Sequence, residues 1–520
     1  MRTTLLRRHL TASPYTLPPT IRQLLSSTTY NSSNEANVTV TGWIKSIRRQ
    51  KRVSFAVVSD GTTSAGLQAV FPNSSLVPKE LTNGASVKLR GRLGKSLGAG
   101  QEKELVVKDV EVLGLCDPET YPIQKQALSH EFLRDNVHLR TRTTSVAAML
   151  RLRHALQREL SFYLEQQGFI HVHTPLLTSN DAEGAGETFK LAKITEKASN
   201  LGKTDVILTD ALSHPEQDDE FFGRPAHLTV SAQLHLESFQ AAISRVWTLS
   251  PSFRAERSQT SRHLSEFWML EAEWGDLPVG TPDTGVRGIC TFVEGMIRAA
   301  VKNVLEAPDT KADIDVSWGP TVDEKLDLKT ERRQEMEKAV FGNGRWNIMT
   351  YGDAILALEE EYERQRRDGR TQFEFKPAWG KSLQSEHEKW LAEVMIGGPV
   401  FVIDYPLESK PFYMRVNDFD GERQTAACFD LLVPGVGELV GGSVREERED
   451  VLLQRMKEVG LWTEENGLGH YEWYMDLRRY GGSPHVGFGM GFERLVSWVG
   501  GIENVRECVP MPRWAGRLLL

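Results

Sequence analysis

The stretch from residue 248 to residue 273 constrains the fold most, because it joins two strand patterns to a set of charged and aromatic side chains. It reads TLSPSFRAERSQTSRHLSEFWMLEAE. Apolar and polar residues alternate at both ends, which predicts a β-hairpin with a short polar loop. Side chains two apart on a strand share a face, so we expect one wall to carry Arg254, Glu256, Phe267 and Glu271. A ring that stacks on a base and a guanidinium that binds phosphate favour a nucleotide; the alternative is a solvated, salt-bridged edge hairpin.

Length and composition are those of a multidomain globular protein. The 520 residues, 40% of them hydrophobic and 25% charged, allow about three domains. The sequence contains no run of eighteen apolar residues, so no membrane span is predicted. The four cysteines form no CxxC pair, which indicates neither a disulfide framework nor a structural zinc site and fits a reducing compartment.

Residues 1–36 differ from the rest in composition. They contain four arginines, many Ser and Thr, and no acidic residue before Glu35. This composition is typical of a mitochondrial transit peptide, so we expect residues 1–36 to be a targeting segment and the mature protein to reside in the mitochondrial matrix. A disordered, mildly basic tail is the alternative.

Residues 37–116 show five short strand patterns with Gly and Asp-Gly turns, which predict a five-stranded OB-fold barrel. Residues 37–116 carry a net charge of +6 and residues 1–36 carry +3, which leaves −17 for residues 117–520 out of the total of −8. A basic barrel attracts a polyanion such as RNA. The basic run Arg48–Arg52 beside Phe55 could bind phosphates and stack a base, or Phe55 could be a core residue.

Two acidic side chains near the end of the chain suggest a metal. Asp430 and Glu438 flank a turn in ACFDLLVPGVGELVGG. Carboxylates near a triphosphate repel it unless Mg²⁺ lies between them, so this pair predicts metal-mediated binding. A turn-capping Asp and an exposed Glu would give the same pattern. Further on, Gly487, Gly489 and Gly491 would leave room for a ligand against the backbone, or would pack a helix on a sheet.

The hairpin segments FRAE, RHLSEF and MLEAE resemble motif 2 of the class II aminoacyl-tRNA synthetases, in the aspartate/asparagine subgroup. A predicted helix, Gly168 and a strand ending at Pro175 resemble motif 1, and GFGMGFERL resembles motif 3. The resemblance covers residues 37–516 and implies an α+β protein. It implies an anticodon-binding OB-fold at 37–116, a hinge at 117–140, and a catalytic domain at 141–516. In that domain helices flank an antiparallel sheet, and a helical insertion occupies about 276–399.

The resemblance also assigns roles to individual positions. Expected ATP-binding residues are Arg254, Glu256, Arg262, His263, Phe267, Glu438 and Arg494, of which Arg254, Glu438 and Arg494 are expected to be catalytic. Expected Mg²⁺ ligands are Asp430 and Glu438. Expected substrate-binding residues are Glu183, Gln233, Glu237, Arg445 and His485, with His485 beside the phosphates. Expected anticodon contacts are Arg48, Phe55 and Gln68.

One position bears on the amino-acid substrate. Aspartate enzymes of the subgroup place a Lys three residues after the Gln that corresponds to Gln233, whereas this chain has Leu236 there and Glu237 beside it. A glutamate accepts a hydrogen bond from an amide NH₂ but repels a second carboxylate, so asparagine fits better than aspartate. The resemblance therefore implies a homodimer, paired through motif 1, that uses ATP and Mg²⁺ to join asparagine to tRNA(Asn). A mitochondrial aspartate enzyme, a tRNA-independent asparagine synthetase and a non-catalytic RNA-binding paralogue are the alternatives.

Overall fold

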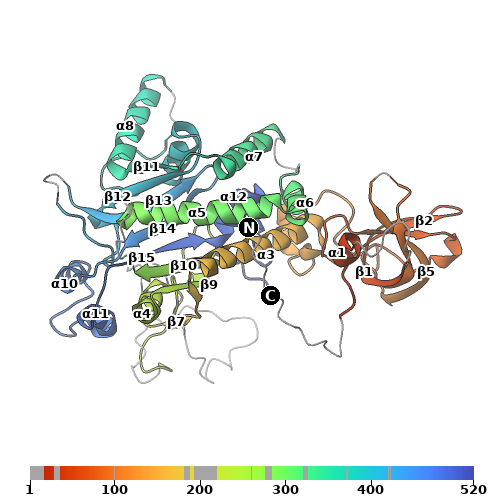
Figure 1. Cartoon of the computed structure of the whole chain (residues 1–520), viewed down its shortest axis with the longest axis horizontal. Coiled ribbons are helices and arrows are strands. Elements are labelled where there is room, and N and C mark those ends of the chain that lie inside the picture. The colour runs from red at the N-terminus through yellow and green to blue at the C-terminus, as the bar shows by residue number, and fades with distance from the viewer. Residues whose placement is uncertain are drawn as a thin grey trace. The chain divides into compact units, whose positions relative to one another are not determined.

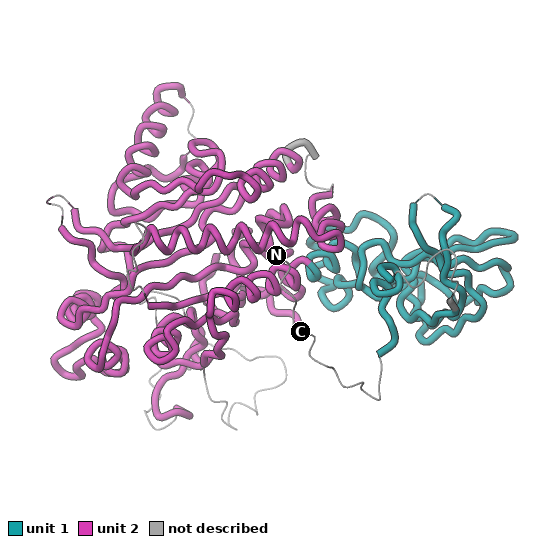
Figure 2. Tube along the Cα trace, in the orientation of Figure 1, with its two compact units in different colours: residues 1–151 teal, residues 152–520 magenta. Residues whose placement is uncertain are grey.

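The chain folds into two compact units, residues 1–151 and residues 152–520, in a computed structural model (Figures 1 and 2). The structure describes residues 17–27, 36–98, 100–180, 188–191, 220–258, 260–275, 284–319, 326–369, 373–419, 421 and 423–520. Within these ranges, no helix is both long and apolar enough to cross a membrane.

The first unit contains a closed five-stranded barrel, which confirms the predicted OB-fold. Its strands are β1 (Ala36–Arg48), β2 (Ser54–Ser59), β3 (Leu67–Phe71), β4 (Ser86–Lys95) and β5 (Lys103–Gly114). They close in the order β1-β2-β3-β5-β4, with β3 and β5 parallel and the other neighbours antiparallel. Alternate side chains, such as Leu67, Ala69 and Phe71 on β3, fill the interior, as a strand with one buried face requires.

A short helix, α1 (Ile21–Ser26), packs against this barrel. The side chains of Ile21 and Leu24 are buried in the barrel core. The Lys103 ammonium on β5 donates hydrogen bonds to three carbonyl oxygens at the end of the helix, at 2.8–3.2 Å. Residues 20–26, which lie within the segment that we expected to be a targeting peptide, are therefore part of the folded barrel unit.

The expected hinge, residues 117–140, also packs against the barrel. Thr82 donates a hydrogen bond to the Cys116 carbonyl at 2.5 Å. Gly84 has a φ of +84°, and a Cβ there would lie 2.7 Å from Cys116 Sγ and 2.9 Å from the ring of Tyr121. This contact is too close for any side chain at position 84. The helix α2 (His130–Asp135) follows, so this segment belongs to the folded unit.

The second unit is built on an eight-stranded sheet in the order β11-β12-β13-β14-β15-β10-β9-β6. The strands are β6 (Ile170–His171), β9 (Arg245–Phe253), β10 (Glu266–Gly275), β11 (Asn347–Thr350), β12 (Val400–Pro406), β13 (Thr425–Val433), β14 (Gly437–Val444) and β15 (His485–Gly491). The outermost pair at each edge is parallel and the remaining pairs are antiparallel, so the sheet is mixed rather than wholly antiparallel. A small separate pair joins β7 (Leu177–Thr178) to β8 (His227–Leu228).

Helices flank this sheet, as predicted (Figure 1). They are α3 (Thr144–Gln166), α4 (Gln233–Ile243), α5 (Gly285–Glu306), α6 (Pro308–Ser317), α7 (Leu326–Phe341), α8 (Tyr351–Arg367), α9 (Ser385–Lys389), α10 (Glu449–Glu458), α11 (Glu472–Arg479) and α12 (Phe492–Gly500). The long helix α5 packs on β13, β14 and β15 with an almost wholly buried apolar face. Since β11 is itself a strand of the sheet, the range 276–399 contains core elements and is not simply a helical insertion.

Candidate active site

The predicted hairpin is formed by β9 and β10, which pair antiparallel with Phe267 opposite Ser252. The backbone N–H of Arg254 donates to the Ser265 carbonyl at 3.0 Å and extends the ladder one step beyond β9. As predicted, Arg254 and Phe267 share a face, with the guanidinium carbon 5.4 Å from the ring centroid. This places a cation beside an aromatic surface at the open end of the hairpin.

One pocket contains all of the expected nucleotide-binding residues. It is lined by Arg254, Glu256, Arg262, His263, Leu264, Phe267, Met269, Glu438, Leu439, Gly489, Gly491, Glu493, Arg494 and Val505. The apolar members were not expected from the sequence. Two of the three glycines singled out, Gly489 and Gly491, line the pocket as predicted. The third, Gly487, makes room for a protein group instead, because a Cβ there would lie 2.1 Å from a carboxylate oxygen of Glu273.

Arg494 and Glu438 are in direct contact at the wall of this pocket. Arg494 Nη1 donates to the Glu438 carbonyl at 2.7 Å and to its carboxylate at 3.2 Å. Burial pushes the pKa of Glu438 up, but the charges of Arg494 and Lys410 outweigh it and hold the pKa below its usual value. Glu438 is therefore an ionised ligand, available to a cation at neutral pH.

A residue that the sequence did not single out connects the walls of the pocket. Glu388, on α9, accepts from the Arg262 guanidinium at 2.8 Å and from the backbone N–H of Glu438 at 3.1 Å. Gly437 has a φ of +84°, and a Cβ there would lie only 2.5 Å from the Glu388 carboxylate. Glu388 comes from a segment far away in sequence from its partners, so no local pattern could have identified it.

His263 lies at the mouth of the pocket in a polar cluster. Its Nε2 is 3.7 Å from the Glu256 carboxylate, and its Nδ1 is 2.9 Å from the Ser258 hydroxyl and 2.6 Å from the Thr260 hydroxyl. Burial lowers the pKa of His263, and the nearby arginines lower it further against the pull of Glu256. A neutral His263 can both accept and donate a hydrogen bond to a phosphate or its metal-bound water.

The two expected metal ligands converge on one point. A Cβ at Gly441 would lie 3.4 Å from Asp430 Oδ1 and 3.5 Å from Glu438 Oε1, so both carboxylates lie over the same glycine. Two carboxylates beside a triphosphate pocket suit Mg²⁺, which binds proteins through one or two carboxylates plus phosphate oxygens. The other Asp430 oxygen accepts from Lys410 Nζ at 3.0 Å. Within the described ranges, no set of three metal-ligating side chains occurs.

A second cluster surrounds the buried carboxylate of Glu237 on α4. Glu237 accepts from Arg478 at 2.8 Å, Tyr474 at 2.7 Å, His485 at 3.0 Å and Gln233 at 3.1 Å. Burial alone would raise the pKa of Glu237, but the charge of Arg478 and the hydrogen bond from His485 lower it strongly. The structure thus brings together Gln233 and Glu237 and adds two residues of α11. His485, which the resemblance placed beside the phosphates, lies against Glu237.

Arg445 joins this cluster to β10. Its guanidinium forms a close ion pair with Glu273 and lies 4.0 Å from the Glu237 carboxylate. Burial raises the pKa of Glu273 to about 7, although Arg445 opposes the shift. Among the expected substrate-binding residues, Glu183 lies outside the described residues.

Two details differ from the sequence-based interpretation. Leu236 packs against Ala232 and Val246 in the hydrophobic core, so Glu237 is the residue of this pair that enters the polar cluster. Glu271, expected on the open wall of the hairpin, is buried and accepts from the Ser231 hydroxyl at 2.5 Å and the Ala232 N–H at 2.9 Å. It therefore fixes the start of α4 to β10.

The three expected anticodon residues lie on one outer face of the barrel. Arg48 pairs with Phe55 between β1 and β2, and Val57 pairs with Gln68 between β2 and β3. Opposite residues in an antiparallel pair share a face, and so do Phe55 and Val57, which puts all three side chains on the same side. Phe55 is only half-buried there, so it is not a core residue of the barrel.

Comparison with known proteins identifies the class. The family described as tRNA synthetases class II (D, K and N) matches residues 129–515. The family described as OB-fold nucleic acid binding domain matches residues 38–113. The chain therefore belongs to the class II tRNA synthetases of the D, K and N group.

The names of individual relatives are more specific than the family description, because they state one amino acid. The chain is 41% identical to an asparagine–tRNA ligase of Legionella pneumophila, over 96% of this chain and 98% of the relative. It is 42% identical to that of Myxococcus xanthus, over 92% and 95%. Among solved structures, asparaginyl-tRNA synthetase of Pyrococcus horikoshii with asparaginyl-adenylate matches with a TM-score of 0.74 and 28% identity, over 96% and 99% of the two chains. The Entamoeba histolytica enzyme with the same ligand matches with a TM-score of 0.72 and 27% identity, over 93% and 96%.

Proposed function

We propose that this protein joins asparagine to tRNA(Asn) in two steps, through an asparaginyl-adenylate made from asparagine and ATP. One observation carries the proposal: the nucleotide pocket and the Glu237 cluster meet on one face of β10. Phe267 and Glu273 are six residues apart on that strand, about 20 Å, so an adenine at one end and an amino acid at the other leave the α-phosphate between them. Relatives named asparagine–tRNA ligases support the choice of amino acid.

The Glu237 cluster is suited to a neutral amide. A substrate NH₂ can take the place of the Gln233 amide on the Glu237 carboxylate, and Arg445 can donate to the side-chain carbonyl. Each of two buried guanidinium groups around this point is already paired with a glutamate, Arg445 with Glu273 and Arg478 with Glu237. The carboxylate of aspartate would meet Glu237 as an uncompensated second anion, which is strongly unfavourable in a buried site.

Activation in this site rests on positioning and electrostatics. The asparagine carboxylate attacks the α-phosphorus in line, the bond between the α- and β-phosphates breaks and pyrophosphate leaves, while Arg254 stabilises the negative charge on the phosphoryl oxygens. Phe267 and Arg494 hold the adenine between a ring and a guanidinium. Bound Mg²⁺ would be held by Asp430 and Glu438 and would neutralise phosphate charge. The 3′-terminal hydroxyl of the tRNA then attacks the adenylate carbonyl and releases AMP.

We also propose the tRNA contact, the assembly and the location. The outer barrel face with Arg48, Phe55 and Gln68 would contact the anticodon. A twofold dimer would form through α3 and β6, where the exposed side chains of Phe162 and Ile170 support an interface. The arginines ahead of Thr20, with no acidic residue among them, support import into mitochondria. Light scattering and fractionation of cells that express the tagged full chain test the last two points.

The test of the central proposal is amino-acid-dependent ATP–pyrophosphate exchange with the full chain. Exchange with asparagine and not with aspartate is the expected result. Exchange with aspartate alone would make it an aspartate enzyme, and no exchange with either, even when tRNA is added, would favour a non-catalytic role. Transfer to tRNA is measured separately with labelled asparagine.

Arg254→Ala is expected to reduce exchange at least a hundredfold, because it removes a charge placed on the transferring phosphoryl group. Circular dichroism and thermal melting check that the variant is folded. Arg366→Ala, which removes an exposed arginine of α8 outside the nucleotide pocket, is the matched control and should retain exchange. Near wild-type exchange by Arg254→Ala would refute the role of Arg254.

A further inference from the structure

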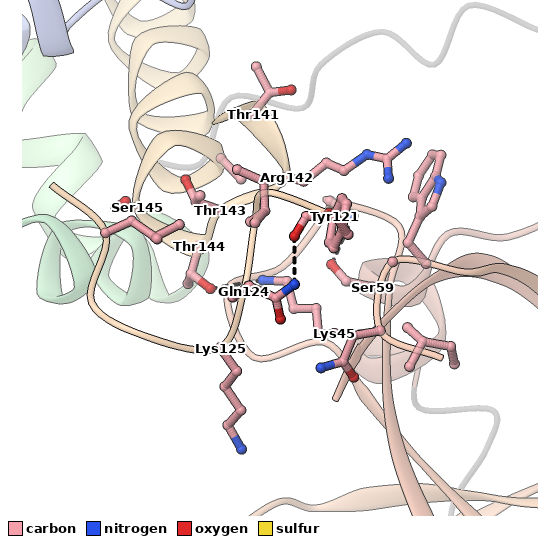
Figure 3. A pocket seen from close by; sticks show the side chains of 18 of the residues that line it. Lys45, Ser59, Tyr121, Gln124, Lys125, Thr141, Arg142, Thr143, Thr144 and Ser145 are labelled. Carbon is pink, nitrogen blue, oxygen red and sulfur yellow. Dashed lines mark hydrogen bonds between the residues drawn. The ribbon is translucent and has the colours of Figure 1, made fainter. Parts of the chain in front are cut away.

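A large pocket in the first unit contains none of the expected catalytic or anticodon-binding residues. It lies between one end of the barrel and the segment that follows β5 (Figure 3). Trp43 and Lys45 of β1 line one side, and Tyr121, Lys125 and Arg142 line the other. All of the lining residues lie within residues 43–147, so the pocket is a feature of this unit alone.

The cations in the pocket have no carboxylate partner among the residues that the structure describes. Lys45 donates to the Thr144 hydroxyl at 2.9 Å, and burial, together with the charge of Arg151, lowers its pKa. The Arg142 guanidinium lies against two rings, with its carbon 5.7 Å from the centroid of Trp43 and 5.8 Å from that of Tyr121. Lys125 is exposed at the rim. An anion entering the pocket would therefore meet cations that need no ion pair to be broken.

Asp60, the acidic residue among those that line this pocket, already accepts hydrogen bonds from protein groups. Asp60 accepts from the backbone N–H of Ile21 at 2.7 Å, and from the N–H and hydroxyl of Thr62 at 3.0 and 2.6 Å. A different kind of group is left over: the buried Oδ1 of Asn83 has no hydrogen-bond partner in the described part of the chain. An acceptor of this kind is satisfied by a donor such as a water molecule or a ligand hydroxyl group.

Cations, an orphaned acceptor and the half-exposed ring of Trp43 correspond to the three parts of a nucleotide in an RNA strand. The phosphate matches Lys45, Lys125 and Arg142; the ribose 2′-hydroxyl matches Asn83; and a base can stack on Trp43. Trp43 pairs with Ser59, which lies four residues along β2 from Phe55 and on the same outer face. The pocket is thus about 13 Å along the barrel face from the expected anticodon residues. An RNA strand bound to that face could extend into the pocket. A free nucleotide is too short to contact both places, so the closeness of the two favours RNA.

We propose that this pocket binds the ribose-phosphate backbone of the tRNA, as a second contact separate from the anticodon. The inference rests on the proposed function, because tRNA is the RNA that such an enzyme would bind. It predicts that the pocket formed by Trp43, Lys45, Asn83, Lys125 and Arg142 contributes to the affinity for tRNA in addition to the anticodon contacts.

The test measures tRNA binding by filter retention at several salt concentrations, for the wild type, Arg142→Gln and Lys125→Gln. Each lost phosphate contact should weaken binding roughly tenfold and reduce the slope of log affinity against log salt by about 0.7 to 1. Lys125 is exposed, so its replacement should not affect folding. Lys108→Gln is the control, because Lys108 is an exposed barrel lysine outside the pocket that contacts Asn37.

Equal slopes and affinities for the pocket variants and Lys108→Gln would overturn the proposal. Equilibrium dialysis with ribose 5-phosphate identifies the other source of the same chemistry. If the pocket variants lose ribose 5-phosphate binding but keep wild-type tRNA binding, the assignment to RNA is wrong. Filter retention needs no catalysis, so a chain that binds tRNA through the pocket but lacks asparagine-dependent exchange would fail only the proposed function.

Discussion

At the scale of single residues, Glu388 is the least expected of the residues that support the nucleotide pocket. It binds Arg262 and the backbone of Glu438 at the same time, so it holds two walls of the pocket together. Burial and the neighbouring charge of Glu438 raise the pKa of Glu388, although Arg262 opposes the shift. Its contacts nevertheless hold the Arg262 guanidinium and the Glu438 backbone in fixed positions beside the pocket.

Glu388→Gln should raise the KM for ATP in the exchange assay by about tenfold, since a charge-assisted hydrogen bond contributes about 1.5–3 kcal/mol. The KM for asparagine should change much less. Glu386→Gln is a suitable control, because Glu386 lies on the same helix but binds the backbone of Glu374 and Phe375 outside the pocket. If both variants raise the KM for ATP equally, Glu388 has no specific role in the nucleotide site.

The residues found from the sequence and those that escaped it differ in a physical way. Arg254 and Phe267 lie on two strands of one hairpin, where alternation alone predicts a shared face. Arg478 reaches Glu237 across 241 positions of the chain, and only the folded sheet brings them together. Leu236 was expected at a specificity position, but helix geometry turns it toward the core. Local sequence patterns therefore predicted residues that share one face of the hairpin. The residues that support them from distant parts of the chain could be identified only in the structure.

At the scale of secondary-structure elements, long patterned segments were predicted well and short ones were not. The barrel strands and the hairpin have clear alternation. The helix α1 has only six residues in a segment rich in Ser, Thr and Arg, and β11 has four residues within a charged, helix-rich stretch. Elements of this length gain their stability from tertiary contacts, so their own sequence carries little signal.

The helix α1 provides a test at this scale. Leu24→Ala removes a fully buried side chain from the barrel core and should cost about 3 kcal/mol of barrel stability, measured by thermal or urea unfolding of the full chain. Leu17→Ala is the control, because Leu17 is 78% exposed and should have no measurable effect. Equal stability of the two variants would mean that α1 does not contribute to the barrel.

At the scale of the whole molecule, charge divides the chain into a basic barrel region of +6 and an acidic remainder of −17 after residue 116. Such a division attracts RNA mainly to the barrel, where released counterions favour binding. The KM for tRNA in aminoacylation should therefore rise steeply between 50 and 200 mM salt, by tenfold or more if several phosphates are contacted.

ATP–pyrophosphate exchange, measured over the same salt range, is the comparison for the tRNA-dependent reaction. The nucleotide pocket of the protein is partly enclosed, so salt screens the paired charges in it much less than exposed charges. Exchange should change only a few-fold. A parallel decline in both activities would show that salt acts on the catalytic unit and not on RNA attraction.

The contact between α1 and Lys103 also sets an order of events during synthesis. The carbonyl of Leu24 accepts a hydrogen bond from the Lys103 ammonium group, which is synthesised 79 residues later. A six-residue helix does not persist alone in water. At ribosomal rates of about 5–20 residues per second, the α1 segment lacks this contact for roughly 4 to 16 seconds, until β5 emerges. During that interval chaperones and proteases can bind a segment that the finished barrel buries.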